Sequence, residues 1–297
     1  MSDQDQLHRF IIENTRVRGE MVHLRDTWQR VLERYDYPPN VRSILGEAFA
    51  ACALLSATIK YDGSLILQIT GDGPLNLLVV QATSAGTMRG LARWQGEDVP
   101  AQDLQAIFGD GQMLMTIKAE RGEPYQGIIT LQGRHIKDAI EGYFIQSEQL
   151  NTRLWLASDQ QQCAGFLLQE LPLAEDQNSD HDNGRHNWEN AELLANTLSH
   201  GELLSLSTED ILHRLFHEED IRLFEPSSIR FSCDCSRERI SQMILSLGQA
   251  EARQIVEQQG KIQVHCEFCN AEYSYDSIDV ESLFASGMEP ENNSPKH

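Results

Sequence analysis

Residues 231–239 read FSCDCSRER and residues 264–270 read VHCEFCN, so four cysteines stand in two short pairs with thirty residues between them. The first pair has the C-x-C spacing and the second has the C-x-x-C spacing. Two closely spaced thiol pairs from separate segments can supply four thiolates in a tetrahedron, which is the arrangement that a structural zinc ion prefers. The spacing therefore predicts one zinc ion per chain, with Cys233, Cys235, Cys266 and Cys269 as its ligands.

Polar residues flank these cysteines, among them Ser232, Asp234 and Glu267. Four unconnected buried thiols would fit such polar surroundings poorly. His265 is a further candidate ligand, but four sulfurs already complete a tetrahedral shell. A catalytic C-x-x-C pair of the thioredoxin kind would follow a strand in a βαβ context, which the residues before Cys266 only partly resemble. We therefore favour a metal site over direct redox catalysis.

Few large apolar side chains surround the cysteines in the segment 231–288. Metal binding would then supply much of the folding free energy, on the order of 10 to 16 kcal/mol in small zinc units. Thiolates are also the form of cysteine that oxidants attack, and oxidised sulfur no longer holds the metal. A disulfide within the C-x-C pair would close a small strained ring, which suits reversible signalling. Loss of metal and loss of fold would be one event.

The other two cysteines, Cys52 and Cys163, stand in apolar surroundings and are expected to be small buried hydrophobes. This placement of six cysteines does not suggest a disulfide framework. The first residues lack the basic end and apolar stretch of a secretory signal, and no uninterrupted apolar run approaches the roughly 18 to 20 residues of a membrane span. We therefore expect a cytoplasmic protein with no membrane partner.

The chain is acidic, with a formal net charge of −21. The acidity is concentrated in residues 175–225, which hold 13 Asp or Glu against three Arg and no Lys, a local charge of −10. Binding to a phosphate backbone depends on Lys and Arg displacing counterions. The charge therefore argues against nucleic acid as a partner.

Apolar alternation with a period of two dominates the first part of the chain. Helices are expected from Asp26, which is a possible cap, to Tyr35, from Pro38-Pro39 to Lys60, and over His135 to Gln149. Strands are expected at Leu7 to Glu13, Val17 to Leu24, Leu65 to Ile69, Leu75 to Val80, Met88 to Trp94, Met113 to Ala119, Gly127 to Gln132, Thr152 to Ser158 and Gly165 to Leu171. The fold class is therefore α+β, with a strand-rich core domain over residues 1–174 that also carries helices.

An acidic helical linker is expected over residues 175–230, after a polar, exposed connection at 174–184. Its apolar residues fall into two helical stripes, one with Trp188, Leu193, Leu194 and Leu198, and one after Thr208 with Ile211, Leu212, Leu215 and Phe216. Isolated helices of this length are marginal in water, so the linker must pack against something else. The zinc domain then occupies 231–288, and a polar tail at 289–297 is expected to be disordered.

The segments around the cysteines resemble signatures of the 33-kilodalton heat-shock proteins, a bacterial family of redox-regulated holdase chaperones. The resemblance extends over nearly the whole chain. Further matching stretches are KYDG at 60–63, GDGPL at 71–75, GYFIQSEQ at 142–149, HRLFHEE at 213–219, LG at 247–248 and EQQG at 257–260.

This resemblance implies an ATP-independent chaperone that binds unfolding proteins and prevents their aggregation under oxidative stress. The reduced, zinc-bound form would be inactive. Oxidation would pair Cys266 with Cys269 first and Cys233 with Cys235 afterwards, release zinc, unfold the zinc domain and loosen the linker. The resemblance also implies a homodimer when the protein is oxidised. The apolar stripes of a loosened linker could then capture client proteins, while its negative charge keeps the complex soluble.

Two other classes of protein fit the sequence less well. A zinc-ribbon regulatory or nucleic-acid-binding module would also use four cysteines, but Lys and Arg are sparse around them. A hydrolase would need a motif that the chain lacks, since it has no G-x-S-x-G, no H-E-x-x-H and no phosphate loop. The polar residues of 142–149, Tyr143 and Glu148 among them, are interpreted as packing and dimer contact. We therefore expect no enzymatic activity.

Overall fold

The computed structural model describes residues 5–58, 62–97, 99–100, 103–119, 121–172 and 181–285, the last range with its side chains from 187 onward. The chain divides into two compact units, Met1–Ser232 and Cys233–His297. The predicted disordered tail at 289–297 and most of the predicted connection at 174–184 lie outside the described residues. The domain bounds 1–174, 175–230 and 231–288 stay a prediction.

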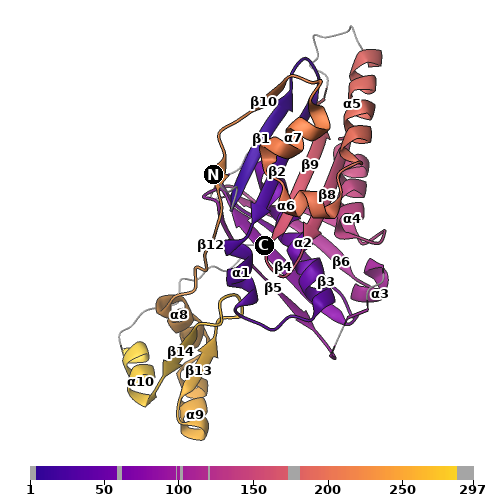
Figure 1. Cartoon of the computed structure of the whole chain (residues 1–297). Coiled ribbons are helices and arrows are strands. Elements are labelled where there is room, and N and C mark those ends of the chain that lie inside the picture. The colour runs from indigo at the N-terminus through magenta and orange to yellow at the C-terminus, as the bar shows by residue number, and fades with distance from the viewer. Residues whose placement is uncertain are drawn as a thin grey trace. The chain divides into compact units, whose positions relative to one another are not determined.

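Two six-stranded sheets form the frame of the first unit (Figure 1). The first sheet has the order β10-β1-β2-β9-β8, and β11 also pairs with β1; the second has the order β12-β5-β4-β3-β6-β7. The strands of the first sheet are β1 (Gln6–Ile12), β2 (Val17–Leu24), β8 (Thr152–Ser158), β9 (Cys163–Glu170), β10 (Ile221–Leu223) and β11 (Ser227–Ser228). Those of the second are β3 (Gly63–Thr70), β4 (Leu75–Thr83), β5 (Thr87–Trp94), β6 (Gln112–Ala119), β7 (Tyr125–Thr130) and β12 (Arg230–Phe231).

Helix α2 (Pro39–Thr58) packs against strands of both sheets and forms the centre of the larger core. Its run Ala48–Leu55 is fully buried because small side chains allow close approach on every side. Glycines on the facing strands allow α2 to approach closely. A Cβ at Gly90 would lie only 2.7 Å from the Phe49 ring, and one at Gly165 only 2.8 Å from the Leu54 side chain, so neither position has room for a larger residue. By length and composition α2 could cross a membrane, but 61% of its most apolar window is buried inside the fold.

The remaining helices of the core are short. Helix α1 (Asp26–Leu32) follows β2, α3 (Leu104–Phe108) precedes β6, and α4 (Ile136–Tyr143) continues into one π-helical turn, Phe144–Glu148. The prediction that Asp26 caps α1 is wrong, since Asp26 lies in the first turn. The cap comes from Asp5, whose carboxylate oxygens accept the backbone N–H groups of Arg25 at 2.7 Å and Thr27 at 2.8 Å.

The acidic linker forms α5 (His181–Ala195), α6 (His200–Ser205) and α7 (Thr208–Phe216), and these helices cover one face of the first sheet (Figure 1). Their apolar side chains make a second core with the sheet, in which Phe10 stacks on Phe166 at 5.9 Å and meets Phe216 at 6.3 Å between ring centroids. Trp188 is buried there as predicted, but Leu193 is 68% exposed. The prediction for Leu193 is wrong because the helical period of the buried stripe runs through Ala191 and Ala195 instead.

Residues 220–232, which we call the strap, include the last part of the predicted linker; they follow α7, lead to the first cysteine and are hydrogen-bonded to both sheets. Its strand β10 pairs with β1, and its strand β12 pairs in parallel with β5. The N–H of Ile229, just before β12, donates to the carbonyl of Asp5 at 2.8 Å, and that of Arg230, the first residue of β12, donates to the carbonyl of Gly86 at 2.9 Å. The strap therefore connects the linker, both sheets and the cysteine segment in one continuous stretch of backbone.

The second unit is a small domain around a hairpin, β13 (Ile262–His265) and β14 (Glu272–Tyr275). Helices α8 (Arg237–Leu247) and α9 (Gln249–Gln259) precede the hairpin, and α10 (Ser277–Ala285) follows it. Among the described residues its apolar core cluster is small, with Ile244, Ala252, Ile262, Tyr275 and Val280 buried and partly buried neighbours around them. Such a small core supplies little folding free energy, which agrees with the expectation of a metal-supported domain.

Candidate metal centre

The four cysteines come from two tight connections of the second unit. Cys233 and Cys235 lie between β12 and α8, where Ser236 caps the helix by accepting the backbone N–H of Arg239 at 3.3 Å. Cys266 and Cys269 lie in the turn between β13 and β14. The helix start and the hairpin turn therefore each fix one pair of thiols.

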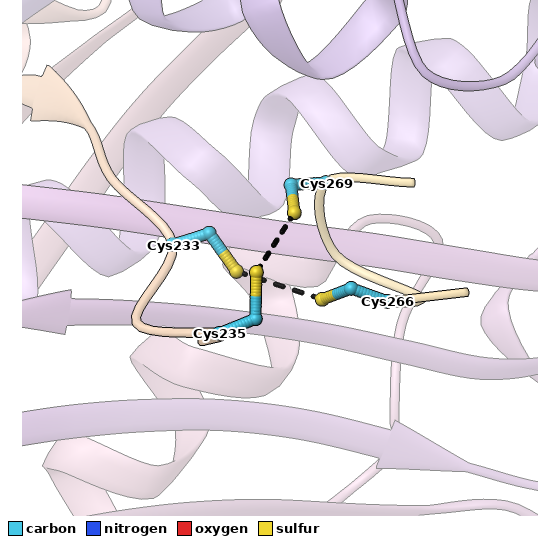
Figure 2. A group of neighbouring side chains, drawn as sticks. All are labelled: Cys233, Cys235, Cys266 and Cys269. Atoms are coloured by element: carbon cyan, nitrogen blue, oxygen red, sulfur yellow. Dashed lines mark hydrogen bonds between the residues drawn. The ribbon is translucent and has the colours of Figure 1, made fainter. Parts of the chain in front are cut away.

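All four sulfur atoms lie within 4.8 Å of one another, and they converge from the two segments (Figure 2). The sulfurs of Cys233 and Cys266 are 3.6 Å apart, and those of Cys235 and Cys269 are 3.2 Å apart. Four sulfurs at about 2.3 Å from one zinc ion would lie about 3.8 Å apart at the corners of a tetrahedron. The residues present therefore fit a four-thiolate metal site, and the four cysteines are the group in the described residues that could hold a metal ion.

The backbone of the turn aims both sulfurs of the second pair to the same side. Asn270 has a left-handed backbone with φ of 54°. Its N–H donates to the Cys266 carbonyl at 2.7 Å, and the Cys266 N–H donates to the Ala271 carbonyl at 2.9 Å. Asn tolerates this conformation better than most residues because its short side chain can hydrogen-bond locally. These backbone hydrogen bonds therefore close the turn that carries Cys266 and Cys269.

The electrostatics of the cluster favour a cation. Burial raises the pKa of the Cys269 thiol, and hydrogen bonds with the thiols of Cys235, Cys266 and Cys233 raise it further. Four crowded sulfurs cannot all carry a negative charge without a compensating positive charge. A divalent ion held by these four sulfurs would supply that charge and keep the thiolates deprotonated.

Two neighbouring side chains contact the cluster or its backbone. The Tyr273 hydroxyl donates to the Cys235 sulfur at 3.2 Å, and Arg239 donates to the Asp234 carbonyl at 2.9 Å. His265, the other candidate ligand, instead faces Glu272 at 3.7 Å with half of its side chain exposed. Tyr273 was not among the predicted site residues, although an aromatic residue with a polar tip, four positions after the last cysteine, is a signal of such a contact.

The two remaining cysteines lie far from solvent. Cys52 and Cys163 are each fully buried in the first unit, as predicted. Burial raises the pKa of the Cys52 thiol to about 12 and that of Cys163 well above its ordinary value. Because the thiolate is the reactive form, both side chains are protected from oxidants in the folded chain.

The residues of 142–149 form a polar cluster with the edge strand β7. The Tyr143 hydroxyl donates to a Glu148 carboxylate oxygen at 2.8 Å and lies 2.9 Å from the Tyr125 hydroxyl. Burial is the largest cause that raises the pKa of Tyr143, and the hydrogen bonds with Tyr125 and Glu148 raise it further. The contacts agree with the packing role expected for this segment, while its dimer contact stays a prediction.

Comparison with known proteins places the chain in a family. The family described as Hsp33 protein matches residues 5–276. A 33 kDa chaperonin of Nitrosococcus oceani is 48% identical over 297 residues, which cover 100% of both chains. One of Shewanella sediminis is 42% identical over 288 residues, covering 97% of this chain and 98% of the relative.

The fold is also similar to that of a solved structure. The crystal structure of a 33 kDa chaperonin from Thermotoga maritima is similar to this chain with a TM-score of 0.81, at 23% identity and with coverage of 95% of this chain and 98% of the other. That likeness confirms the mixed α+β architecture. The full-length sequence matches go further, and by them this chain belongs to the Hsp33 family of chaperones.

Proposed function

We propose that this chaperone is a redox-regulated, ATP-independent holdase whose activity is held back by one zinc ion. In the reduced state the ion is bound by Cys233, Cys235, Cys266 and Cys269, and the protein is inactive. Oxidation pairs Cys266 with Cys269 and Cys233 with Cys235, and it releases the ion. The convergence of four sulfurs within 4.8 Å is the observation that carries the proposal.

The cysteines perform both parts of the switch. When bound, the metal joins the helix-start segment to the hairpin turn and compensates the charge of the thiolates. Each disulfide takes two electrons from two thiolates, which reduce one molecule of a peroxide to two of water with the uptake of two protons. Sulfurs joined in disulfides no longer bind zinc as thiolates, so the small core of the second unit loses its main support.

The strap carries the loss of structure toward the linker. Phe231 packs against the larger core, and the Arg34 guanidinium lies 6.0 Å from the centre of its ring. The next residue, Ser232, makes the last backbone hydrogen bond of the strap, to Met88. An unfolded second unit would begin at Cys233, directly after this bond, and thermal motion of that chain would pull on β12 first.

Release of the strap and linker would open an apolar surface for clients. Phe10, Met21 and Phe166 of the first sheet are buried in the second core, together with Trp188 and Phe216 of the linker helices. An exposed apolar surface of this kind binds the apolar segments that unfolding proteins expose to water. The acidic linker would keep the complex soluble. The proposal includes a cytoplasmic location and a homodimer of the oxidised form, and no step of it turns over a substrate.

The test measures zinc, thiols and chaperone activity on one preparation. Reduced protein should hold one zinc ion per chain, and peroxide should release it as four thiols disappear. Light scattering of a denaturing client should then fall only with the oxidised protein. Cys266→Ser should lose zinc and suppress aggregation without oxidant, while Cys163→Ala, which changes a buried cysteine of the first unit, should behave like the parent. Reduced protein that is metal-free yet folded beyond Cys233, or that protects clients as well as the oxidised form does, would refute the proposal.

A further inference from the structure

We infer that His213 and His217 form a second metal site, on the outer face of the linker, which binds one divalent ion of the zinc and nickel class and holds the last turn of α7. The two histidines lie one helical turn apart. His213 lies within α7, and His217 follows as its C-cap with a helical backbone, φ −64° and ψ −17°. Side chains with this i, i+4 spacing are neighbours on one face of a helix.

Both imidazole rings are on the solvent side of α7, because the other side of the helix is docked. Ile211, Leu215 and Phe216 are buried in the second core. His213 is exposed, and the His217 side chain is 61% exposed. The two ring centroids lie 6.4 Å apart. Exposed side chains change rotamer without disturbing a core, so each ring can turn a nitrogen to about 2.0 Å from a shared ion.

The ligand chemistry of the pair suits a divalent transition metal. Two histidines at i and i+4 on one helix face are a ligand pair that proteins use for zinc, and imidazole also suits nickel. The pair is smaller than the cysteine cluster, which is the group of three or more possible ligands in the part of the chain that the structure describes. Water would therefore fill the remaining positions, and the ion would be held less tightly than by four thiolates.

The charge around the pair favours a cation. A carboxylate oxygen of Glu218 lies 3.9 Å from Nε2 of His217. Arg214, the neighbouring cation on α7, forms an ion pair with Glu202, which compensates its charge. The segment 175–225 as a whole has a formal charge of −10. A negative field of this kind raises the local concentration of cations, so the linker attracts a divalent ion toward the two rings.

An ion bound to both rings would stabilise the end of α7. It binds the helical arrangement and not the unfolded segment, in which the two rings separate, so it favours the folded linker by mass action. Such an ion would oppose the loosening of the linker, and this consequence rests on the proposed function. The metal site itself does not depend on that function, because reduced protein is sufficient to test it.

The experiment uses full-length, tag-free protein that is reduced, loaded with zinc and kept free of oxygen. Nickel(II) is titrated by calorimetry into the parent, His213→Ala, His217→Ala and the control His200→Ala, which changes an exposed histidine at the start of α6. Parent and control should bind one nickel ion per chain, and the other two variants should bind it at least about tenfold more weakly. Zinc content should stay constant, since zinc displaced in proportion to bound nickel would place the nickel at the cysteines and overturn the site.

Hydrogen exchange then measures the stabilisation of α7. With free nickel at about ten times its dissociation constant, the α7 amides should exchange about tenfold more slowly in the parent and at an unchanged rate in His217→Ala. Nickel binding that survives both histidine substitutions, or that leaves exchange in the parental α7 unchanged, would overturn the inference. Reduced protein without zinc at the cysteines would refute the zinc switch alone, because the two histidine substitutions would still report on the linker site.

Discussion

Ser232 donates its backbone N–H to the carbonyl oxygen of Met88 at 3.0 Å, and the next residue along the chain is the first cysteine of the metal centre. The larger core therefore ends at one hydrogen bond, and the cysteine cluster begins one residue later. No flexible segment separates the cysteines from β12 in the sequence, so unfolding of the second unit would directly affect the pairing of β12. This adjacency makes the strap a place where the proposed switch can be weakened without touching a cysteine.

Metal removal should unfold the second unit and leave the first unit folded. A chelator used under reducing conditions should abolish amide protection in α8, α9 and α10, while α2 keeps its protection. Hydrogen exchange read by mass spectrometry checks this, and added zinc should restore the protection. Persistent protection of α8 to α10 in the metal-free chain would contradict a metal-dependent fold.

Truncation of the Phe231 side chain should lower the temperature at which the reduced protein begins to suppress client aggregation. Phe231→Ala removes a partly buried ring that anchors β12, at a cost of about 1 to 3 kcal/mol, below that of a fully buried phenylalanine. Zinc should remain bound, because no ligand changes. Light scattering across temperature, with zinc content measured in parallel, gives the answer. Phe224→Ala is the control, since Phe224 also lies in the strap but is 40% exposed.

Loosening the linker should mimic oxidation. Phe216 is 2% exposed and contacts Phe10, so Phe216→Ala should weaken the docking of α7 by about 3 to 5 kcal/mol. The reduced, zinc-bound variant should bind an apolar dye and suppress client aggregation. Leu193→Ala also removes a large apolar side chain from the linker, but from a position 68% exposed, and it should leave both signals unchanged. Equal behaviour of the two variants would argue against a client surface beneath the linker.

A buried carboxyl should make the first unit less stable as the pH rises. Burial raises the pKa of Glu20 from 4.5 to about 7, and Arg18 and Arg9 only partly oppose it. Between pH 4.5 and 7 the folded chain keeps a proton that the unfolded chain releases, so the free energy of unfolding falls across this window, by about 2 to 3 kcal/mol.

Glu20→Gln should remove this dependence, gaining stability over the parent at pH 8 but not at pH 4.5. Urea unfolding of both proteins at the two pH values measures the difference. Glu33→Gln is a suitable control because the Glu33 side chain is 54% exposed. A pH dependence that Glu20→Gln leaves unaltered would show that other groups cause it.

The sequence predicted what depends on local pattern. Alternation over seven to nine residues predicted the long strands, and the two cysteine spacings predicted a cluster that the structure brings together. The strap strands were missed because two or three residues, as in Ser227–Ser228, are too few to show a period. The cap of α1 was misassigned because it comes from Asp5, twenty residues before Arg25, and spacing along the chain does not report such pairings.

The enclosure of α2 between two sheets bears on how the protein could recover after stress. Its central buried run, Ala48–Leu55, belongs to the larger core, whereas the buried apolar side chains of the linker helices belong to the second core. Release of the linker would therefore leave the larger core intact. Once a reductant and zinc are supplied, return to the inactive state would then require only that the linker helices fold back onto the first sheet. If the proposed switch operates in this way, the same chain would act repeatedly without new synthesis.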